Sequence, residues 1–259
     1  MEYKGIITID PGHGGKDPGA LGRDGSKEKD NTLNQSLILK STLEKQGFKV
    51  YLTRDKDEFI NLSTRKDIAY KYKSHLLISI HNNSFFNPTA NGIETWNYPS
   101  STNGRKAGQY VQKELISATS LTNRGNKEAK FTVLTGRSVA ILIELGFISN
   151  DIECKLLKDK DYQNTVAIAI TKGVCQYFNV QYIEPITEIP TLESDCACIG
   201  HGTITATVLN VRAKPLTGAV VGTLKSGEKV SIIESINGWY KIIFENHVRY
   251  VSSKYVKMI

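Results

Sequence analysis

The chain has 259 residues, of which 40% are hydrophobic and 23% are charged, as in an ordinary soluble globular protein with one large and one small domain. Its formal charge of +7 is consistent with solubility alone or with attraction to a polyanion, either an anionic cell-wall polymer or nucleic acid. Four cysteines are too few for a disulfide framework, and no apolar run approaches the roughly 18 residues of a membrane helix. No secretory signal precedes the first apolar run, so we expect a protein that is cytoplasmic when made and does not insert into membranes.

The first apolar run, residues 6–9, predicts a short buried strand that Asp10, Pro11 and Gly12 end abruptly. His13 follows, with Gly12 before it and two more glycines after it. Because glycine has no side chain, another group can approach this imidazole closely. The position suits a metal ligand, although a histidine in a glycine-rich loop is more often a turn residue.

Strand and helix patterns then alternate. A helix is expected at about 32–46, capped by Asp30 or Asn31 and with Glu28 just ahead of it. A strand at 48–53, a helix after Ser63 and a strand at 76–80 follow. This order indicates parallel strands with right-handed crossovers, and therefore an α/β fold with a mostly parallel, twisted sheet flanked by helices. Further elements are expected at 92–98 (strand), 104–118 (helix), 131–148 (a strand carrying Glu144) and 159–178 (helix).

Polar side chains follow three of the predicted strands. His13 ends the first, His81 follows 76–80, and Glu144 ends the apolar run 139–143. Ligands of open α/β sheets bind at the carboxyl ends of the strands, so these side chains should converge, and Glu28 is a fourth candidate. Two histidines with carboxylates and an open coordination position are typical of catalytic rather than structural zinc.

Four sequence blocks resemble the zinc-dependent N-acetylmuramoyl-L-alanine amidases. They are Asp-Pro-Gly-His-Gly-Gly at 10–15, Lys-Glu-Lys at 27–29, Ser-Ile-His-Asn-Asn at 79–83 and Ile-Glu-Leu-Gly-Phe-Ile-Ser-Asn at 143–150. The blocks occur in the family's order, and the resemblance covers about residues 3–178. The loop between Gly15 and Glu28 is charged and glycine-rich here, and Asn82 stands where a small residue is more usual.

The resemblance implies that His13, Glu28 and His81 bind Zn²⁺ and that Glu144 is the catalytic carboxylate. Zinc would lower the pKa of a bound water and polarise the scissile carbonyl. Glu144 would take a proton from the attacking water and return it to the leaving amine. By resemblance, the bond cut joins N-acetylmuramic acid to the L-alanine of the peptidoglycan stem, which would lyse bacterial cells.

Several other residues remain open. Trp96 and Tyr98 are interpreted as sheet packing or as rim residues that contact substrate, and Glu94 as a structural or supporting carboxylate. Cys154 and Cys175 are expected in helices as core residues. Cys196 and Cys198 form a Cys-x-Cys pair without the further ligands of a metal site.

The composition changes after residue 180. We expect an amidase domain at 1–180, a proline-containing linker at 181–202 and a domain at 203–259. Short strand-like runs at 203–213, 219–224, 229–236, 239–244 and 247–251 predict a small all-β barrel. Its sequence resembles bacterial Src-homology-3-like modules, which commonly bind cell walls. Arg249-Tyr250 replaces a frequent Gly-Trp, and Trp239 is as consistent with a core position as with ligand contact.

The hypothesis is therefore a peptidoglycan amidase, either a phage endolysin released by a separate holin-type protein or a lysin of a sporulating cell, with no nucleic-acid partner. One alternative is a non-enzymatic protein that binds walls or nucleic acid, which would have no need of Glu144. The other is a zinc peptidase that cuts a different amide with the same site chemistry.

Overall fold

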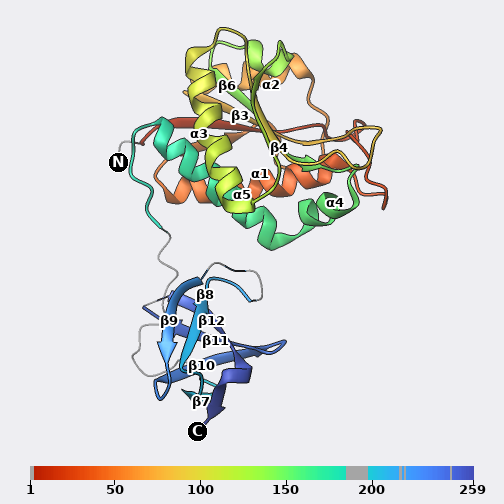
Figure 1. The fold of residues 1–259 in the computed structure, drawn as a ribbon. Helices are drawn as coiled ribbons and strands as arrows, with labels where there is room; N and C mark the ends of the chain where they lie inside the picture. The colour runs from red at the N-terminus through yellow and green to blue at the C-terminus, as the bar shows by residue number, and fades with distance from the viewer. Residues whose placement is uncertain (1–2, 185–197, 216–217, 219, 246) are drawn as a thin grey trace. The chain divides into compact units, whose positions relative to one another are not determined.

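The computed structural model describes residues 3–184, 198–215, 218, 220–245 and 247–259 (Figure 1). The chain divides into two compact units, Met1–Ile183 and Glu184–Ile259. Each has its own hydrophobic core. Most of the expected linker, including both of its prolines and Cys196, lies outside the described residues. Among the described helices, none combines the length and the apolar composition needed to cross a membrane.

The first unit is built on a six-stranded sheet with the order β2-β1-β3-β6-β4-β5. All adjacent pairs are parallel except β4 and β6, which are antiparallel. The predicted mostly parallel α/β fold is confirmed. Its strands are β1 (Ile6–Pro11), β2 (Lys49–Leu52), β3 (Leu76–Asn83), β4 (Ile93–Asn97), β5 (Asn123–Glu128) and β6 (Val139–Phe147).

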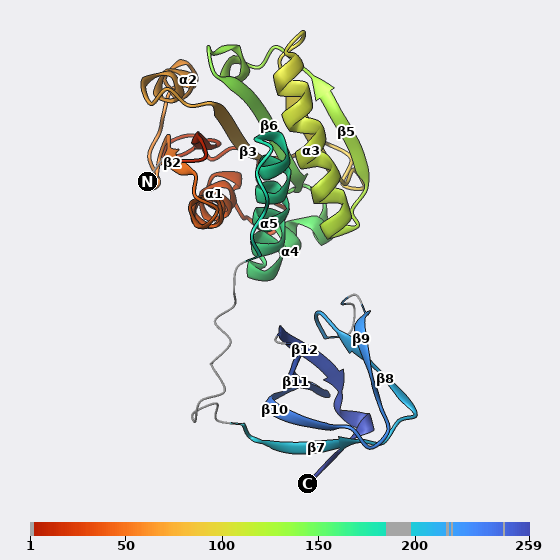
Figure 2. The ribbon, with the colours of Figure 1, turned by 90° about the vertical axis from the view of Figure 1, so that its left-hand side faces the viewer.

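Helices cover the two faces of this sheet unequally (Figure 2). The main core lies on one face, where Leu76, Ile78 and Ile80 pack with three long helices. Leu77 points to the other face and packs with a smaller cluster from one helix and a 3₁₀ turn. The three long helices are α1 (Glu28–Lys45), α3 (Thr102–Thr119) and α5 (Lys160–Tyr177), and a short helix, α4 (Asp151–Lys158), precedes α5. The helix and the 3₁₀ turn on the other face are α2 (Leu62–Lys71) and η1 (Thr132–Thr135).

Helix α1 begins earlier than predicted. Glu28 is its first residue rather than a residue ahead of it, and neither Asp30 nor Asn31 is the cap. The backbone N–H of Glu28 donates to Ala20 O at 2.9 Å, which fixes the entry to the helix, and acidic residues suit the positive end of the helix dipole. The helical spacing of Leu33, Leu37, Ile38 and Leu43 predicts one apolar side for this helix, but Leu37 is 40% exposed.

The differences elsewhere have local causes. His81 lies inside β3, which pairs with β6 as far as Asn83, rather than just after the strand. The segment 131–148 supplies the predicted strand that carries Glu144, which covers Val139–Phe147, and η1 lies ahead of it. Strand β5 was not predicted because its sequence, Asn-Arg-Gly-Asn-Lys-Glu, is polar throughout. Cys154 and Cys175 are buried and free, as expected for core residues.

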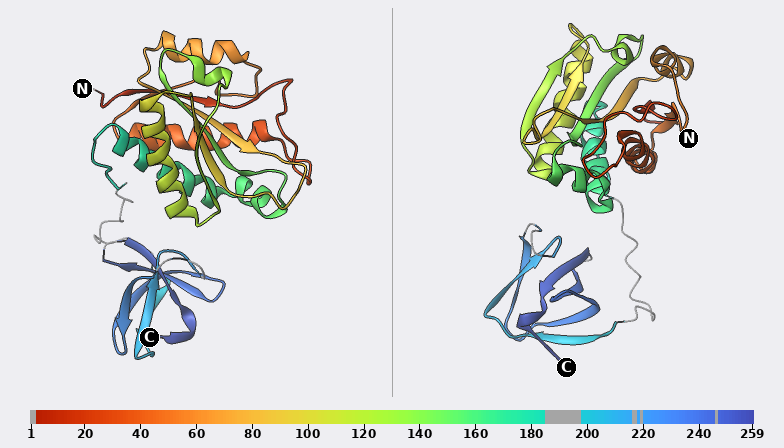
Figure 3. Two further views of the ribbon diagram at one scale, coloured as in Figure 1. Left: turned by 45° about the horizontal axis from the view of Figure 1, so that its top comes forward. Right: turned by 90° about the vertical axis from the view of Figure 1, so that its right-hand side faces the viewer.

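The second unit is an antiparallel sheet with the order β13-β7-β10-β11-β12-β8-β9 (Figure 3). Its small core includes Ile204, Val211, Ile232, Ile242 and Val251. The run 203–213, expected as one strand, is split between β7 and β8. The strands are β7 (Gly200–Ile204), β8 (Val208–Arg212), β9 (Val220–Lys225), β10 (Lys229–Ile236), β11 (Trp239–Phe244), β12 (His247–Ser252) and β13 (Val256–Met258), with a 3₁₀ turn, η2 (Ser253–Tyr255), before β13.

Candidate metal centre

Three of the predicted site residues meet at the carboxyl ends of β1 and β3 and the start of α1. One ligand atom from each of His13, Glu28 and His81 lies within 4.8 Å of the others. His13 Nε2 is 3.1 Å from Glu28 Oε2, and His81 Nδ1 is 2.9 Å from Glu28 Oε1. The two imidazole rings stand nearly perpendicular, with centroids 5.0 Å apart. The expected convergence of the two imidazoles with a carboxylate is therefore present.

Glycines make room for these rings. A Cβ at Gly12 would lie 2.4 Å from Cε1 of His81, and one at Gly19 would lie 2.6 Å from Cδ2 of His13. His13 itself adopts a left-handed conformation, with φ of 62°. The close approach of another group at Gly12 is confirmed. Gly19 has a similar role but lies outside the glycine-rich motif at 10–15, so the sequence did not suggest it.

The carboxylate of Glu28 is fixed from two sides. The backbone N–H groups of Ala20 and Asn82 donate to its two oxygens at 2.9 and 3.0 Å. Burial alone would raise the pKa of Glu28, but the hydrogen bonds and charges of His13 and His81 outweigh burial and hold that pKa well below its ordinary value. Glu28 is therefore ionised at neutral pH, as a metal ligand must be.

Asp17 orients the first histidine. Its Oδ2 lies 2.8 Å from His13 Nδ1, and its Oδ1 accepts from the backbone N–H of Gly19 at 3.1 Å. A carboxylate on Nδ1 leaves Nε2 free to face Glu28, and this is the usual arrangement for a metal-binding histidine. Burial lowers the pKa of His13, but contacts with Glu28 and Asp17 more than offset it, so the net shift is upward.

Two buried arginines hold the loop that carries His13. Arg54 donates to Pro11 O at 3.0 Å and to Gly12 O at 2.8 Å. Arg65 donates to His13 O at 2.8 Å and pairs with the buried Asp10 at 2.8 Å. These contacts satisfy the loop's carbonyl groups and define its backbone.

Glu144 lies beside the cluster of His13, Glu28 and His81 but is not one of its members. It lies opposite His81 in the β3–β6 ladder, and its Oε2 is buried without a hydrogen-bond partner among the described residues. Burial first, and the negative charges of Glu28 and Glu94 next, raise the pKa of Glu144 well above its ordinary value. A carboxyl group poised in this way is typical of a general base.

Glu94 is the neighbour of Glu144 across the β4–β6 ladder. Its Oε2 pairs with Arg124 at 2.7 Å and with Lys127 at 2.6 Å, and Asn83 donates to its other oxygen at 2.9 Å. The two cations compensate the charge of Glu94, which is consistent with the structural or supporting carboxylate that the sequence suggested.

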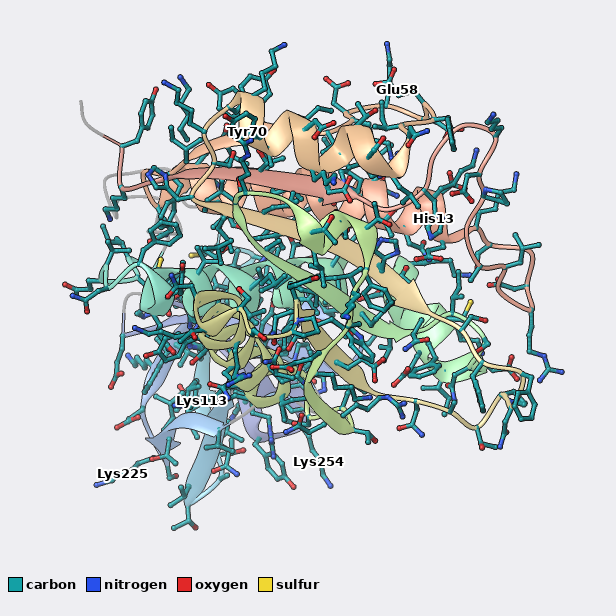
Figure 4. All side chains as sticks on the ribbon, turned by 90° about the horizontal axis from the view of Figure 1, so that it is seen from above. His13, Glu58, Tyr70, Lys113, Lys225 and Lys254 are labelled. Atoms are coloured by element: carbon teal, nitrogen blue, oxygen red, sulfur yellow. The ribbon has the colours of Figure 1, made fainter. Side chains whose placement is uncertain are left out.

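The candidate site opens into a cavity of about 650 Å³ on the face of the sheet that α2 and η1 cover. His13, Glu28, His81 and Glu144 all contribute to its wall, together with apolar side chains such as Phe59 and Phe131. Figure 4 shows His13 in the loop at this edge of the molecule. Trp96 and Tyr98 pack on the cluster beneath η1, so the packing interpretation holds for both, and neither lines the cavity.

The donor set fits a zinc ion. Two imidazoles and one carboxylate are the ligands of several catalytic zinc sites, and a second carboxylate with an unpaired buried oxygen stands beside them. A mostly parallel α/β sheet with such a cluster at its strand ends defines a candidate metal-dependent hydrolase.

Comparisons with known proteins narrow this class. Residues 7–176 match the family model described as N-acetylmuramoyl-L-alanine amidase, and residues 207–257 match the bacterial SH3 domain. The chain belongs to the N-acetylmuramoyl-L-alanine amidase family and carries a bacterial SH3 domain.

Individual relatives agree with this assignment. AmiA of Escherichia coli is 32% identical over 222 residues, which cover 68% of this chain and 77% of AmiA. The probable cell wall amidase LytH of Staphylococcus epidermidis is 35% identical, but the match spans 67% of this chain and only 58% of LytH. Among solved structures, an amidase from Clostridium difficile 630 has 36% identity and a TM-score of 0.66, covering 68% of this chain and 97% of that one. AmiC2 of Nostoc punctiforme also has 36% identity and a TM-score of 0.66.

In the second unit, Trp239 is outside the core cluster. It lines a hollow of about 410 Å³ with Asn210, Arg212 and Tyr255, among others. Tyr255 is 40% exposed. Of the two interpretations of Trp239, the core position is therefore not supported, and ligand contact stays a prediction.

Proposed function

We propose that this protein is a zinc-dependent peptidoglycan hydrolase that cleaves the amide between N-acetylmuramic acid and the L-alanine of the stem peptide, and that this cleavage lyses bacterial cells. The observation that carries the proposal is the cluster of His13, Glu28 and His81 beside the unpaired carboxyl group of Glu144. Membership of the amidase family supports the choice of bond.

His13, Glu28 and His81 would hold the zinc ion. When bound, zinc supplies a Lewis acid that polarises the scissile carbonyl and lowers the pKa of a water molecule. Asp17 keeps Nε2 of His13 directed at the site, and the backbone donors on Glu28 keep its carboxylate in place.

Glu144 would act first as general base and then as general acid. Its carboxylate takes a proton from the attacking water as oxygen adds to the lactyl carbonyl carbon, and the same carboxyl group returns that proton to the alanine nitrogen as the C–N bond breaks. One water is consumed, and a lactyl carboxylic acid and a free amine are formed. The raised pKa of Glu144 brings its proton affinity closer to that needed at neutral pH.

The SH3 unit would bind the wall through the hollow lined by Trp239 and Tyr255, and so keep the catalytic unit on its insoluble substrate. Phage origin and release through a holin-type protein stay predictions.

The test uses purified Gram-positive walls, with turbidity, new amino termini and new reducing sugars followed together. Four samples are compared: wild type, chelator-treated wild type, the same sample with zinc restored, and Glu144→Ala. We expect turbidity to fall and alanine amino termini to rise only in the first and third, with no new reducing sugars. New amino termini from another residue would instead identify a peptidase, and wall binding without release of amines would refute an enzymatic role.

A further inference from the structure

Lys130 stands out among the residues that line the catalytic cavity. Besides the two imidazoles, the cavity wall has two cationic side chains, Arg65 and Lys130. Arg65 is buried and donates to Asp10, Pro11 O and His13 O. No hydrogen bond or ion pair of Lys130 is found within the described part of the chain, and its side chain is exposed. Lys130 is therefore the cation of this wall that can pair with a substrate.

The backbone around Lys130 is held in place. Ala129 N–H donates to Asn97 O at 3.0 Å, which ties the segment to β4. The ring of Phe131 packs edge-on against Trp96, with centroids 5.4 Å apart, and Phe131 O accepts from Leu134 N–H at 2.9 Å. The ammonium group thus has a fixed base and a long, flexible stem.

The order of the strands places Lys130 at one end of the cavity. The candidate zinc ligands come from the loop after β1, from β3 and from α1, and Glu144 comes from β6. Beyond β6 lie β4 and β5, from which the chain runs directly to Lys130. Phe59 and Leu62 come from the opposite end of the cavity wall, after β2. A substrate whose scissile amide sits between the zinc ligands and Glu144 therefore has one side towards Phe59 and the other towards Lys130.

The two ends differ in chemistry. Phe59 and Leu62 are apolar, which suits the uncharged faces of a sugar. At the other end Phe131 and Val133 are apolar too, but the ammonium group of Lys130 suits a carboxylate. Arg65, the other cationic side chain of the wall, is already paired with Asp10. An acidic group of the substrate would therefore pair with Lys130, whose ammonium group has no such partner in the described part of the chain.

We propose that Lys130 binds a carboxylate on the residue that follows the L-alanine of the stem peptide, and that it makes the enzyme prefer a free carboxylate to a carboxamide at that position. This inference rests on the proposed amidase function and names the peptide feature that the same site selects. Lys130 acts in substrate binding and takes no part in the proton transfers.

The test compares two soluble substrates, N-acetylmuramoyl-L-alanyl-γ-D-glutamyl-L-lysine and its form with the glutamyl α-carboxylate replaced by a carboxamide. In both, the γ-carboxyl group of that residue is bound in the peptide, so the residue after L-alanine has a free carboxylate in the first substrate only. We measure kcat and KM of the zinc-loaded full chain for both, at low and high salt. Wild type should favour the carboxylate about fivefold in kcat/KM, mainly through KM, and salt should reduce the preference.

Variants then isolate the charge. Lys130→Met should remove the preference, with kcat/KM for the carboxylate substrate falling to that for the carboxamide, and Lys130→Arg should retain it. Lys113→Met is the matched control, since Lys113 is exposed on α3, far from His13 in Figure 4, and its loss removes the same charge. As a readout independent of turnover, the affinity of Glu144→Gln for the two compounds should show the same preference, and Lys130→Met should abolish it.

The outcomes separate the two claims. Cleavage of both substrates by wild type with equal kcat/KM, or a preference that survives in Lys130→Met, refutes the role of Lys130 and leaves the amidase function intact. Cleavage of neither substrate by zinc-loaded wild type refutes the amidase function and this inference with it.

Discussion

Substitution of Gly12 by alanine tests the packing on which the candidate site depends. The added Cβ would lie 2.4 Å from Cε1 and 2.6 Å from Nε2 of His81, whereas ordinary contact begins at 3.4 Å. Gly12 has no left-handed backbone angle, so alanine introduces a steric conflict and no backbone strain.

The backbone at Gly12 cannot retreat easily. Its N–H donates to Ile80 O at 3.0 Å, and its carbonyl accepts from Arg54 at 2.8 Å and from Thr32 at 2.8 Å. The imidazole of His81 must therefore move by about 1 Å, and a displacement of that size at a reacting centre costs on the order of 10²-fold in rate.

The assay is zinc titration against a chromophoric chelator, with kcat/KM measured on soluble muropeptide. Gly12→Ala should bind zinc at least about tenfold more weakly than wild type. Gly25→Ala is the control, because Gly25 has a φ of 82° and nothing within 4 Å of its Cβ position. It should lose about 1 kcal/mol of stability without losing zinc affinity. If Gly12→Ala binds zinc and cleaves substrate as well as wild type, the predicted steric conflict with the imidazole of His81 is refuted.

Three further predictions concern other parts of the chain. Asp17→Asn should lower zinc affinity about tenfold by weakening the orientation of His13, and equal affinity by calorimetry would contradict this. In metal-free protein, Glu144→Gln should be as stable as wild type below the ordinary carboxyl pKa of 4.5, because the group is then protonated in both the folded and the unfolded state. As pH rises through the raised pKa of the folded state, wild type loses stability that Glu144→Gln keeps. The variant should therefore be about 1–3 kcal/mol more stable in urea unfolding at pH 8. A stability difference that does not depend on pH would contradict the raised pKa of Glu144. A chain ending at Ile183, which is tied to Gln46 by two hydrogen bonds of 2.7 Å, should fold and cleave soluble muropeptide like the full chain but bind purified walls more weakly; equal wall binding would remove the role given to the SH3 unit.

The convergence of the site residues could be predicted from the sequence, because the carboxyl ends of parallel strands share one edge of a sheet. His13, His81 and Glu144 could therefore be placed from local patterns alone. Arg54 also follows a predicted strand, at 48–53, so its position near the site was predictable from the same pattern.

Other features could not be predicted from local patterns. Asp17, Gly19 and Arg65 matter through contacts between segments distant in the sequence or through the path of an irregular loop. The start of α1 at Glu28 depends on a hydrogen bond to Ala20 in that loop, and no helix-capping residue marks it. The exposure of Leu37 has a similar origin, because the buried face of α1 is partly polar: Thr32 donates to Gly12 O at 2.8 Å there, and Gln35 to Leu157 O at 3.3 Å.

Hydrolysis of N-acetylmuramoyl-L-alanyl peptide in ¹⁸O-labelled water, with the products identified by mass spectrometry, tests the proposed reaction directly. We expect zinc-loaded wild type, but not Glu144→Ala, to give one ¹⁸O atom in the lactyl carboxyl group and an unlabelled peptide with a free alanine amino terminus. Label in a carboxyl group of the peptide, or equal product from Glu144→Ala, would refute the proposed mechanism.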